Sequence, residues 1–132
     1  MLEHQRVARE STGGDRLVHW DVRADNVLVR DGQVVLLDWA WACRGAAWLD
    51  TLTLALELRI QGGPDADELL GAWPLTRDVP PAQLAALVAC LAGFWAERAR
   101  RPAPPGLPTI RAWQQHCATA ALTWLDTGRL WT

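Results

Sequence analysis

The chain has 132 residues and a mass of 14.6 kDa, the size of one ordinary domain, and its 50% hydrophobic and 21% charged residues exclude an intrinsically disordered protein. A formal net charge of -2 with no basic stripe argues against nucleic acid as a partner. No apolar run is long enough to span a membrane and the N-terminus has no signal-peptide pattern, so we expect a cytoplasmic protein without a membrane partner.

The first predicted element is the end of a helix over Leu2 to Glu10, and the breaker cluster 11–14 stops it. Two short β-branched runs follow, at 27–29 and 34–37. Asp31-Gly32 between them tolerates the positive φ angles of a tight turn. These features predict a β-hairpin with polar residues at both outer ends.

The rest of the chain has the apolar spacing of helices. The helix expected from 46 to 60 is apolar on nearly all sides, which indicates burial, and Asp65 with Glu68 resembles a capping box. Proline-rich segments separate the later helices. The expected helices are 46–60, 65–73, a long one after Pro80-Pro81 that ends near 97–101, and a last one from about 109 to near 128.

Two features of the composition limit the chemistry. Every one of the 13 basic residues is Arg, so the chain has no Lys to form a Schiff base or to hold a phosphate. Cys43, Cys90 and Cys117 are odd in number, far apart and without a CxxC pair. We therefore expect buried, reduced thiols, with neither a disulfide framework nor a zinc site.

Side chains that can carry chemistry gather between His19 and Asp38. Asp21 is followed five residues later by Asn26, and the hairpin returns the chain to Asp38, so we expect three oxygen ligands close together. Phosphoryl transfer needs a carboxylate that accepts the proton of the attacking hydroxyl, and hard oxygen ligands that hold Mg²⁺. His19 is then expected to organise the loop and not to act as a base.

The pattern His19-x-Asp21-x-x-x-x-Asn26, an apolar strand and then Leu37-Asp38-Trp39 resembles the catalytic loop and metal-binding Asp of the kinase-like fold. It is most similar to the aminoglycoside phosphotransferase and choline kinase-like family of small-molecule kinases. The segment 45–50 also looks like the family's Gly-x-x-x-x-Asp segment, which enters a buried helix. The motifs cover about residues 15–60, and the helical remainder agrees only in class.

The resemblance implies an ATP-dependent phosphotransferase, with ATP and Mg²⁺ as cofactors and a small molecule as hydroxyl acceptor. Its catalytic residues would be Asp21, His19 in the same loop and Arg23. Asn26 and Asp38 would bind the cofactor and its metal ion. Arg23 is placed to contact the transferred phosphate, and a solvated surface position explains it equally well.

The chain also departs from the family's pattern. Trp20 stands where the family usually has Gly, and it could crowd the acceptor side of the loop. Asp50 is expected to accept hydrogen bonds under the loop or to cap a helix. No glycine-rich phosphate loop precedes His19. The expected fold is therefore α+β, mainly α, a single domain over 1–132. It would be the C-terminal lobe of a protein-kinase-like fold, with a catalytic loop, a short hairpin and about four helices and without the nucleotide-binding lobe.

Two other functions fit the same residues. A noncatalytic remnant, which folds or binds a partner without turnover, fits the missing lobe and the absence of Lys. An exposed lobe interface would then favour self-association. A metal-dependent phosphohydrolase is weaker, because it explains neither the spacing from Asp21 to Asn26 nor the hairpin.

The tryptophans have alternative roles as well. Trp95, Trp113 and Trp124 lie at helical spacing and are expected in the core before they are expected in a substrate cage. Trp39 and Trp41 flank Asp38, where they would line the acceptor pocket or, as we favour, pack behind the loop.

Overall fold

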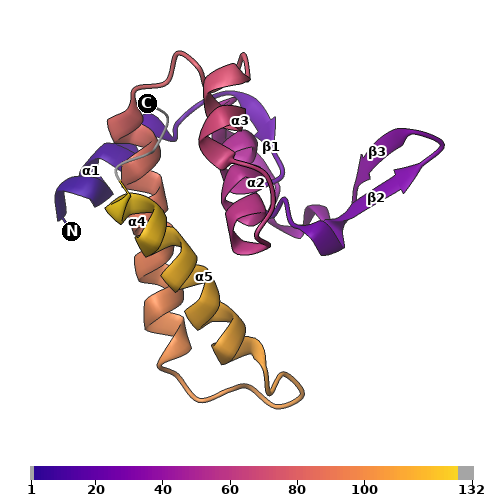
Figure 1. The fold of residues 1–132 in the computed structure, drawn as a ribbon, viewed down its shortest axis with the longest axis vertical. Helices are drawn as coiled ribbons and strands as arrows, with labels where there is room; N and C mark the ends of the chain where they lie inside the picture. The colour runs from indigo at the N-terminus through magenta and orange to yellow at the C-terminus, as the bar shows by residue number, and fades with distance from the viewer. Residues whose placement is uncertain (1, 128–132) are drawn as a thin grey trace.

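The structure is a computed structural model that describes residues 2–127. It is mainly helical, with short antiparallel strands in the first third of the chain (Figure 1). The elements in chain order are α1 (Leu2–Ser11), β1 (Arg16–Val18), the 3-10 turn η1 (Ala24–Asn26), β2 (Val27–Arg30), β3 (Gln33–Leu36), the 3-10 turn η2 (Trp39–Trp41), β4 (Cys43–Gly45), α2 (Leu49–Ile60), α3 (Ala66–Ala72), α4 (Pro81–Ala99) and α5 (Ile110–Asp126). The mainly helical α+β class expected from the sequence is confirmed.

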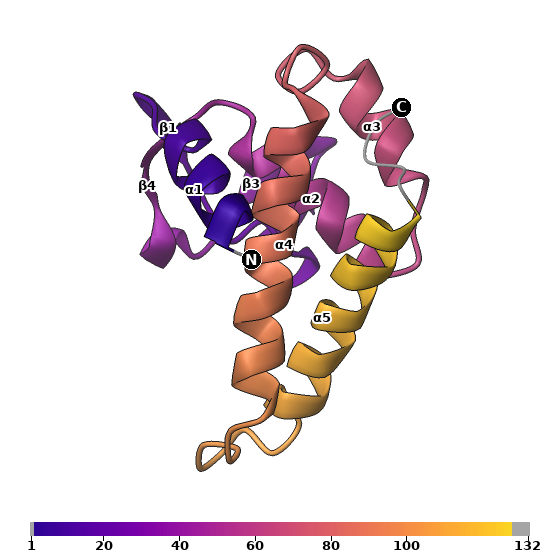
Figure 2. The same ribbon diagram turned by 90° about the vertical axis from the view of Figure 1, so that its left-hand side faces the viewer.

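The helices pack around one hydrophobic core. α4 and α5 run antiparallel and side by side, α1 packs against α4, and α2 lies against α3 and α5 (Figures 1 and 2). Leu52 and Leu56 of α2, Leu84 of α4 and Trp124 of α5 are all buried. The nearly all-round apolar pattern of the predicted helix 46–60 is therefore explained, because α2 is enclosed by other helices.

The ends of the helices follow local chemistry. Asp65 caps α3 by accepting a hydrogen bond from the Asp67 backbone N–H at 2.9 Å, as its spacing predicts. Pro81 stands in the first turn of α4, where its missing N–H costs nothing. α2 begins at Leu49 and not at residue 46, and α5 ends at Asp126. Gly128, where the last helix was predicted to stop, lies outside the described residues.

The predicted hairpin is confirmed. β2 and β3 pair with Val29 opposite Val34, and both Asp31 and Gly32 at the turn have positive φ angles, of 52° and 75°. Positive φ at both central residues is the condition for a type I′ turn, whose twist matches that of the strands. The Asp-Gly dipeptide thus sets the register of the hairpin.

A second strand pair was not predicted. β1 pairs with β4, with Leu17 opposite Arg44, so the chain after the hairpin returns to lie beside the chain before the loop. Gly14 enables a close approach here, because a Cβ on it would collide with the backbone carbonyl of Gly45. The pairing places the start of α2 under residues 19–21.

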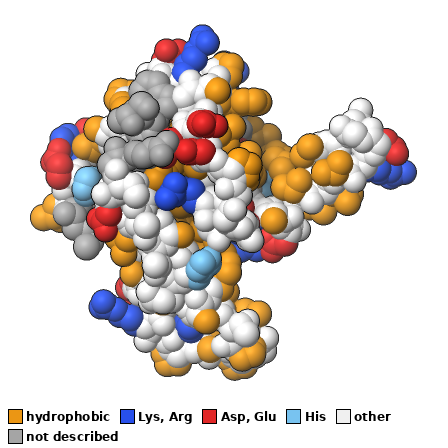
Figure 3. Space-filling view, in the orientation of Figure 1, with side chains coloured by type: hydrophobic (Ala, Val, Ile, Leu, Met, Phe, Trp, Pro, Cys, Tyr) orange, Lys and Arg blue, Asp and Glu red, His pale blue; other side chains and the backbone are white. Residues whose placement is uncertain are grey.

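The hairpin projects from the helical body (Figure 1). Apart from polar residues at the turn end, its side chains are apolar and largely exposed on both faces, and a space-filling view shows hydrophobic side chains gathered along it (Figure 3). Leu28, Val29, Val34 and Val35 are between 43% and 66% exposed. No helix within residues 2–127 has both the length and the apolar content that membrane crossing needs.

Candidate active site

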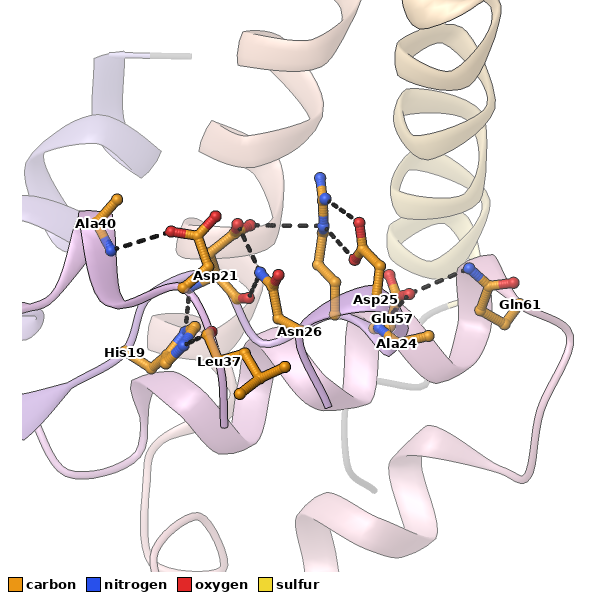
Figure 4. Close-up of polar contacts among 11 residues, drawn as sticks. His19, Asp21, Ala24, Asp25, Asn26, Leu37, Ala40, Glu57 and Gln61 are labelled. Carbon is orange, nitrogen blue, oxygen red and sulfur yellow. Dashed lines mark hydrogen bonds and ion pairs between the residues drawn. The ribbon is translucent and has the colours of Figure 1, made fainter. Parts of the chain in front are cut away.

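The loop between β1 and η1 is organised around a buried histidine (Figure 4). His19 is fully buried, its Nδ1 accepts a hydrogen bond from the Asp21 backbone N–H at 3.3 Å, and its Nε2 lies 2.8 Å from the Leu37 carbonyl oxygen. An acceptor at Nδ1 and a carbonyl beside Nε2 require the neutral tautomer with its proton on Nε2. Both ring nitrogens are therefore occupied, and His19 makes the contacts of a loop organiser.

Asp50 holds the backbone at the start of the loop. Its two carboxylate oxygens accept hydrogen bonds from the N–H groups of His19 at 2.8 Å and Trp20 at 2.9 Å. Trp20 has a φ of 70°, in the left-handed region that favours glycine, so these bonds stabilise a strained backbone. The expected structural role of Asp50 is confirmed, and its alternative role as a helix cap is wrong, because Trp48 is the N-cap residue of α2.

Asn26 lies directly against Asp21. Its Nδ2 donates to the backbone oxygen of Asp21 at 2.9 Å and to the carboxylate Oδ2 of Asp21 at 3.0 Å. The amide nitrogen is thereby turned toward Asp21, and among the described residues Oδ1 of Asn26 accepts no hydrogen bond. An amide oxygen in that state is suited to bind a hard cation.

The hairpin brings Asp38 back toward Asn26. The backbone N–H of Leu37 donates to the Asn26 carbonyl oxygen at 2.8 Å. Asp38 is the next residue in the chain, so its backbone begins beside Asn26. Asp38 is exposed, has a φ of 55°, and accepts a hydrogen bond from Ala40 N–H at 3.4 Å. Asp21 and Asn26 are thus in contact, and Asp38 is linked to them through the backbone.

The sequence predicts that an amide oxygen and a carboxylate, those of Asn26 and Asp38, together bind a metal ion. Within residues 2–127 no group of three or more His, Cys, Asp and Glu side chains is placed to hold a metal ion. The expected set differs in kind, because it uses the amide oxygen of Asn26 together with the carboxylate of Asp38. Both are hard oxygen donors, so their chemistry fits Mg²⁺.

Arg23 is bound on several sides. Its guanidinium is paired with Asp25 at 2.5 Å and with Asp21 at 3.7 Å, and it lies 5.2 Å from the ring centroid of Trp113 on α5. Burial by itself lowers the pKa of Arg23, but the hydrogen bond to Asp25 and the charge of Asp21 outweigh it and raise the pKa. The side chain of Arg23 is 34% exposed and therefore only partly buried, and both expectations for Arg23 stay predictions.

Two cavities adjoin the loop on the side of α5. One, of about 100 Å³, is lined by Asp21 and Trp20 together with Trp95 and Trp113. The other, of about 370 Å³, shares Arg23, Glu57 and Trp113 with it. Asp21 therefore lies at the wall of a small aromatic cavity, and Trp20 lies at the same wall.

Sequence reasoning did not single out Glu57, which lies in the predicted helix 46–60. It placed Trp95 and Trp113 in the core before a substrate cage, and both are partly buried and pack against the core. Trp95 and Trp113 meet edge to face, with ring centroids 6.4 Å apart. Only Trp124 of the three predicted core tryptophans is fully buried. The helical spacing of Trp95 and Trp113 indicated that both lie on an apolar helix face. Such spacing does not indicate which part of the chain this face contacts.

The tryptophans beside Asp38 differ from each other. Trp39 packs edge-on against His19, at 4.6 Å between ring centroids, and its Nε1 donates to the Leu36 carbonyl oxygen. Trp39 thus contacts the loop histidine but is itself 45% exposed, so the packing favoured from the sequence is only partly seen. Trp41 is 67% exposed and does not share that position.

Comparison with known proteins adds no identification. No protein-family model, no curated protein and no solved structure matches the chain.

Proposed function

We propose that the chain is the catalytic lobe of an ATP-dependent small-molecule kinase, which transfers the γ-phosphate of ATP to a hydroxyl group. The observation that carries the proposal is the contact between Asn26 and Asp21, with Asn26 Nδ2 3.0 Å from the Asp21 carboxylate. This contact orients a proton acceptor and at the same time leaves an amide oxygen for a cation. The likeness of the loop to those of the aminoglycoside phosphotransferase and choline kinase-like family supports the same reaction.

In this proposal the residues divide the work between them. Asp21 orients the acceptor hydroxyl and takes its proton, since Asp21 lines the small cavity. Asn26 and Asp38 hold Mg²⁺, which, when bound with ATP, neutralises the charge of the phosphates. Arg23 is the cation closest to Asp21, and its guanidinium can bind phosphate oxygens if it leaves Asp25.

The exposed hairpin favours a second candidate, a noncatalytic binding module. A two-stranded hairpin that is apolar on both faces is stabilised by a covering partner, and binding such a partner requires no turnover. The residues of the loop would then serve folding alone.

Phosphate transfer from radiolabelled ATP separates the two candidates. The chain is incubated with Mg²⁺ and a panel of hydroxyl acceptors that includes choline, homoserine, amino sugars and aminoglycosides. We expect labelled product with at least one acceptor, and the variant Asp21→Asn should lower its rate by about 10² to 10⁴-fold, because proton transfer is lost.

Asp31→Asn is the matched control, since Asp31 lies at the hairpin turn with a 90% exposed side chain. It should leave the transfer rate unchanged. Transfer that survives in Asp21→Asn contradicts the role of Asp21. If the chain neither binds Mg²⁺·ATP nor labels any acceptor, the binding module is the better description.

A further inference from the structure

α2 presents a second carboxylate to the loop. Glu57 follows Asp50 by two helical turns and therefore lies on the same face of α2. Asp50 accepts hydrogen bonds at the beginning of the loop, from His19 and Trp20. Glu57 acts at the other end, where its Oε1 accepts a hydrogen bond from the Ala24 backbone N–H at 3.2 Å (Figure 4). The two carboxylates thus hold both ends of one loop.

The position of Ala24 explains why this bond matters. Ala24 is the first residue of η1, and the first N–H groups of a helical turn have no partner within the turn. Among the described residues, the side chain of Arg23, the N-cap residue, makes no capping bond. Glu57 therefore supplies the missing cap from another helix, and its negative charge suits the N-terminal end of the turn.

The turn connects Glu57 to the candidate active site. η1 is closed by a hydrogen bond from Asn26 N–H to the Arg23 carbonyl oxygen at 3.0 Å. Asn26, its last residue, then reaches Asp21 through its side chain. A displacement of Ala24 would be transmitted through one short turn to the Asn26 amide group.

We propose that Glu57 is a positioning residue that fixes the η1 turn and, through it, sets Asn26 against Asp21. Glu57 is only 8% exposed, and its Oε1 also accepts a hydrogen bond from Gln61 Nε2 at 3.1 Å. The placement of Asn26 follows from the bond between Glu57 and Ala24 and from the closed η1 turn. The catalytic consequence rests on the proposed kinase function.

Hydrogen exchange of single backbone amides, measured by NMR, tests the placement without ATP or turnover. Glu57→Ala should accelerate exchange of the Asn26 amide about tenfold, because that amide closes the turn. The amides of His19 and Trp20, which Asp50 holds, should stay within about twofold. Glu57→Gln keeps an acceptor oxygen and should restore most of the protection.

Gln61→Ala is the matched control, since it removes the other partner of the Glu57 carboxylate and leaves the bond to Ala24. Its Asn26 amide should exchange as in the wild type. Unchanged exchange at Asn26 in Glu57→Ala overturns the proposal. An equal acceleration at His19, Trp20 and Asn26 also overturns it, because it would mean general destabilisation.

A second substitution tests the bond from the donor side. Ala24→Pro removes the N–H, and the site accepts proline because Arg23 before it has the extended angles φ -131° and ψ 162°. In this background Glu57→Ala should no longer change the exchange of the Asn26 amide by more than about twofold. A full effect of Glu57→Ala in the proline variant would show that Glu57 acts by another route.

The catalytic consequence has its own readout. In a chain that transfers phosphate, Glu57→Ala should raise the Mg²⁺ concentration needed for half-maximal rate about tenfold, and Glu57→Gln should reverse most of this shift. A lowered rate with an unchanged Mg²⁺ requirement contradicts the role assigned to Asn26. If no chain transfers phosphate, the kinase proposal fails, while the exchange experiment still decides the placement by Glu57.

Discussion

At the scale of single residues, the loop is held by hydrogen bonds from carboxylates to backbone N–H groups. Asp50 is the clearest case, because it binds two such groups next to Trp20, whose φ of 70° is strained. Hydrogen bonds to a charged group contribute about 1.5–3 kcal/mol each and can therefore compensate such strain. The loop geometry is thus a property of α2 as much as of the loop's own residues.

Asp50→Ala is expected to lower the free energy of unfolding by about 2–4 kcal/mol, since two N–H groups lose their acceptors. Urea unfolding measures it as a lower midpoint at constant slope. Asp50→Asn keeps one acceptor oxygen, and its free energy of unfolding should lie between those of the wild-type chain and Asp50→Ala. Asp78→Ala, at a side chain that is 87% exposed, should change the stability by less than about 0.5 kcal/mol. Equal effects at both sites would contradict the role of Asp50.

The three cysteines differ in exposure, so the expectation of buried thiols is only partly correct. Cys117 is buried, Cys90 is half-buried, and Cys43 on β4 is exposed. All three are free, as expected. The reason is that β4 lies at the edge of a two-stranded sheet, a pairing which the sequence did not indicate.

Thiol alkylation should be fastest at the exposed Cys43 and slowest at the buried Cys117. Burial raises the pKa of Cys117 to about 11, so at pH 8 its reactive thiolate is scarce and its sulfur is inaccessible as well. We expect one fast thiol in the folded chain and three in denaturant, counted by mass spectrometry. Cys43→Ser should abolish the fast phase. A fast phase that persists in this variant would show that another cysteine is accessible.

At the scale of elements, local signals predicted what local chemistry determines. Asp31-Gly32 specified the hairpin turn, Asp65 the start of α3, and the apolar pattern the burial of α2. The pairing of β1 with β4 escaped prediction because each strand has three residues, of which two are exposed, and therefore shows no alternation. Its partners are also far apart in sequence, and Gly14 marks the contact only once Gly45 is known to lie opposite.

The candidate site shows the same division between local and distant signals. The spacing from Asp21 to Asn26 predicted their contact, because the turn between them is short. Glu57 could not be predicted, since its bond to Ala24 depends on how α2 crosses the loop. Trp113 lies on α5, far along the chain, and only the packing of the helices brings it over Arg23. Contacts between residues close in sequence could therefore be predicted, and contacts supplied by distant helices could not.

At the scale of the whole molecule, the chain divides into a packed helical body and a projecting apolar hairpin (Figures 1 and 3). The body satisfies its buried side chains, since no described buried side-chain nitrogen or oxygen lacks a hydrogen bond. The hairpin differs from the body, because its valines and leucines are exposed to water. Its sheet has only two strands, so the outer edges of β2 and β3 pair with no further strand of the described residues. Water contact with this surface therefore favours association through the hairpin.

We expect the chain to self-associate, with an average mass in sedimentation velocity that rises with concentration. Val29→Thr combined with Val34→Thr should shift the distribution toward the monomer, because the two side chains are paired on one face and are each 66% exposed. Thr keeps the β-branched shape that favours strands, so the hairpin itself should persist. Leu122→Gln is the matched control, since Leu122 is 49% exposed but lies on α5. A wild-type chain that stays monomeric at all concentrations, or an equal effect of Leu122→Gln, would mean that the hairpin does not mediate association.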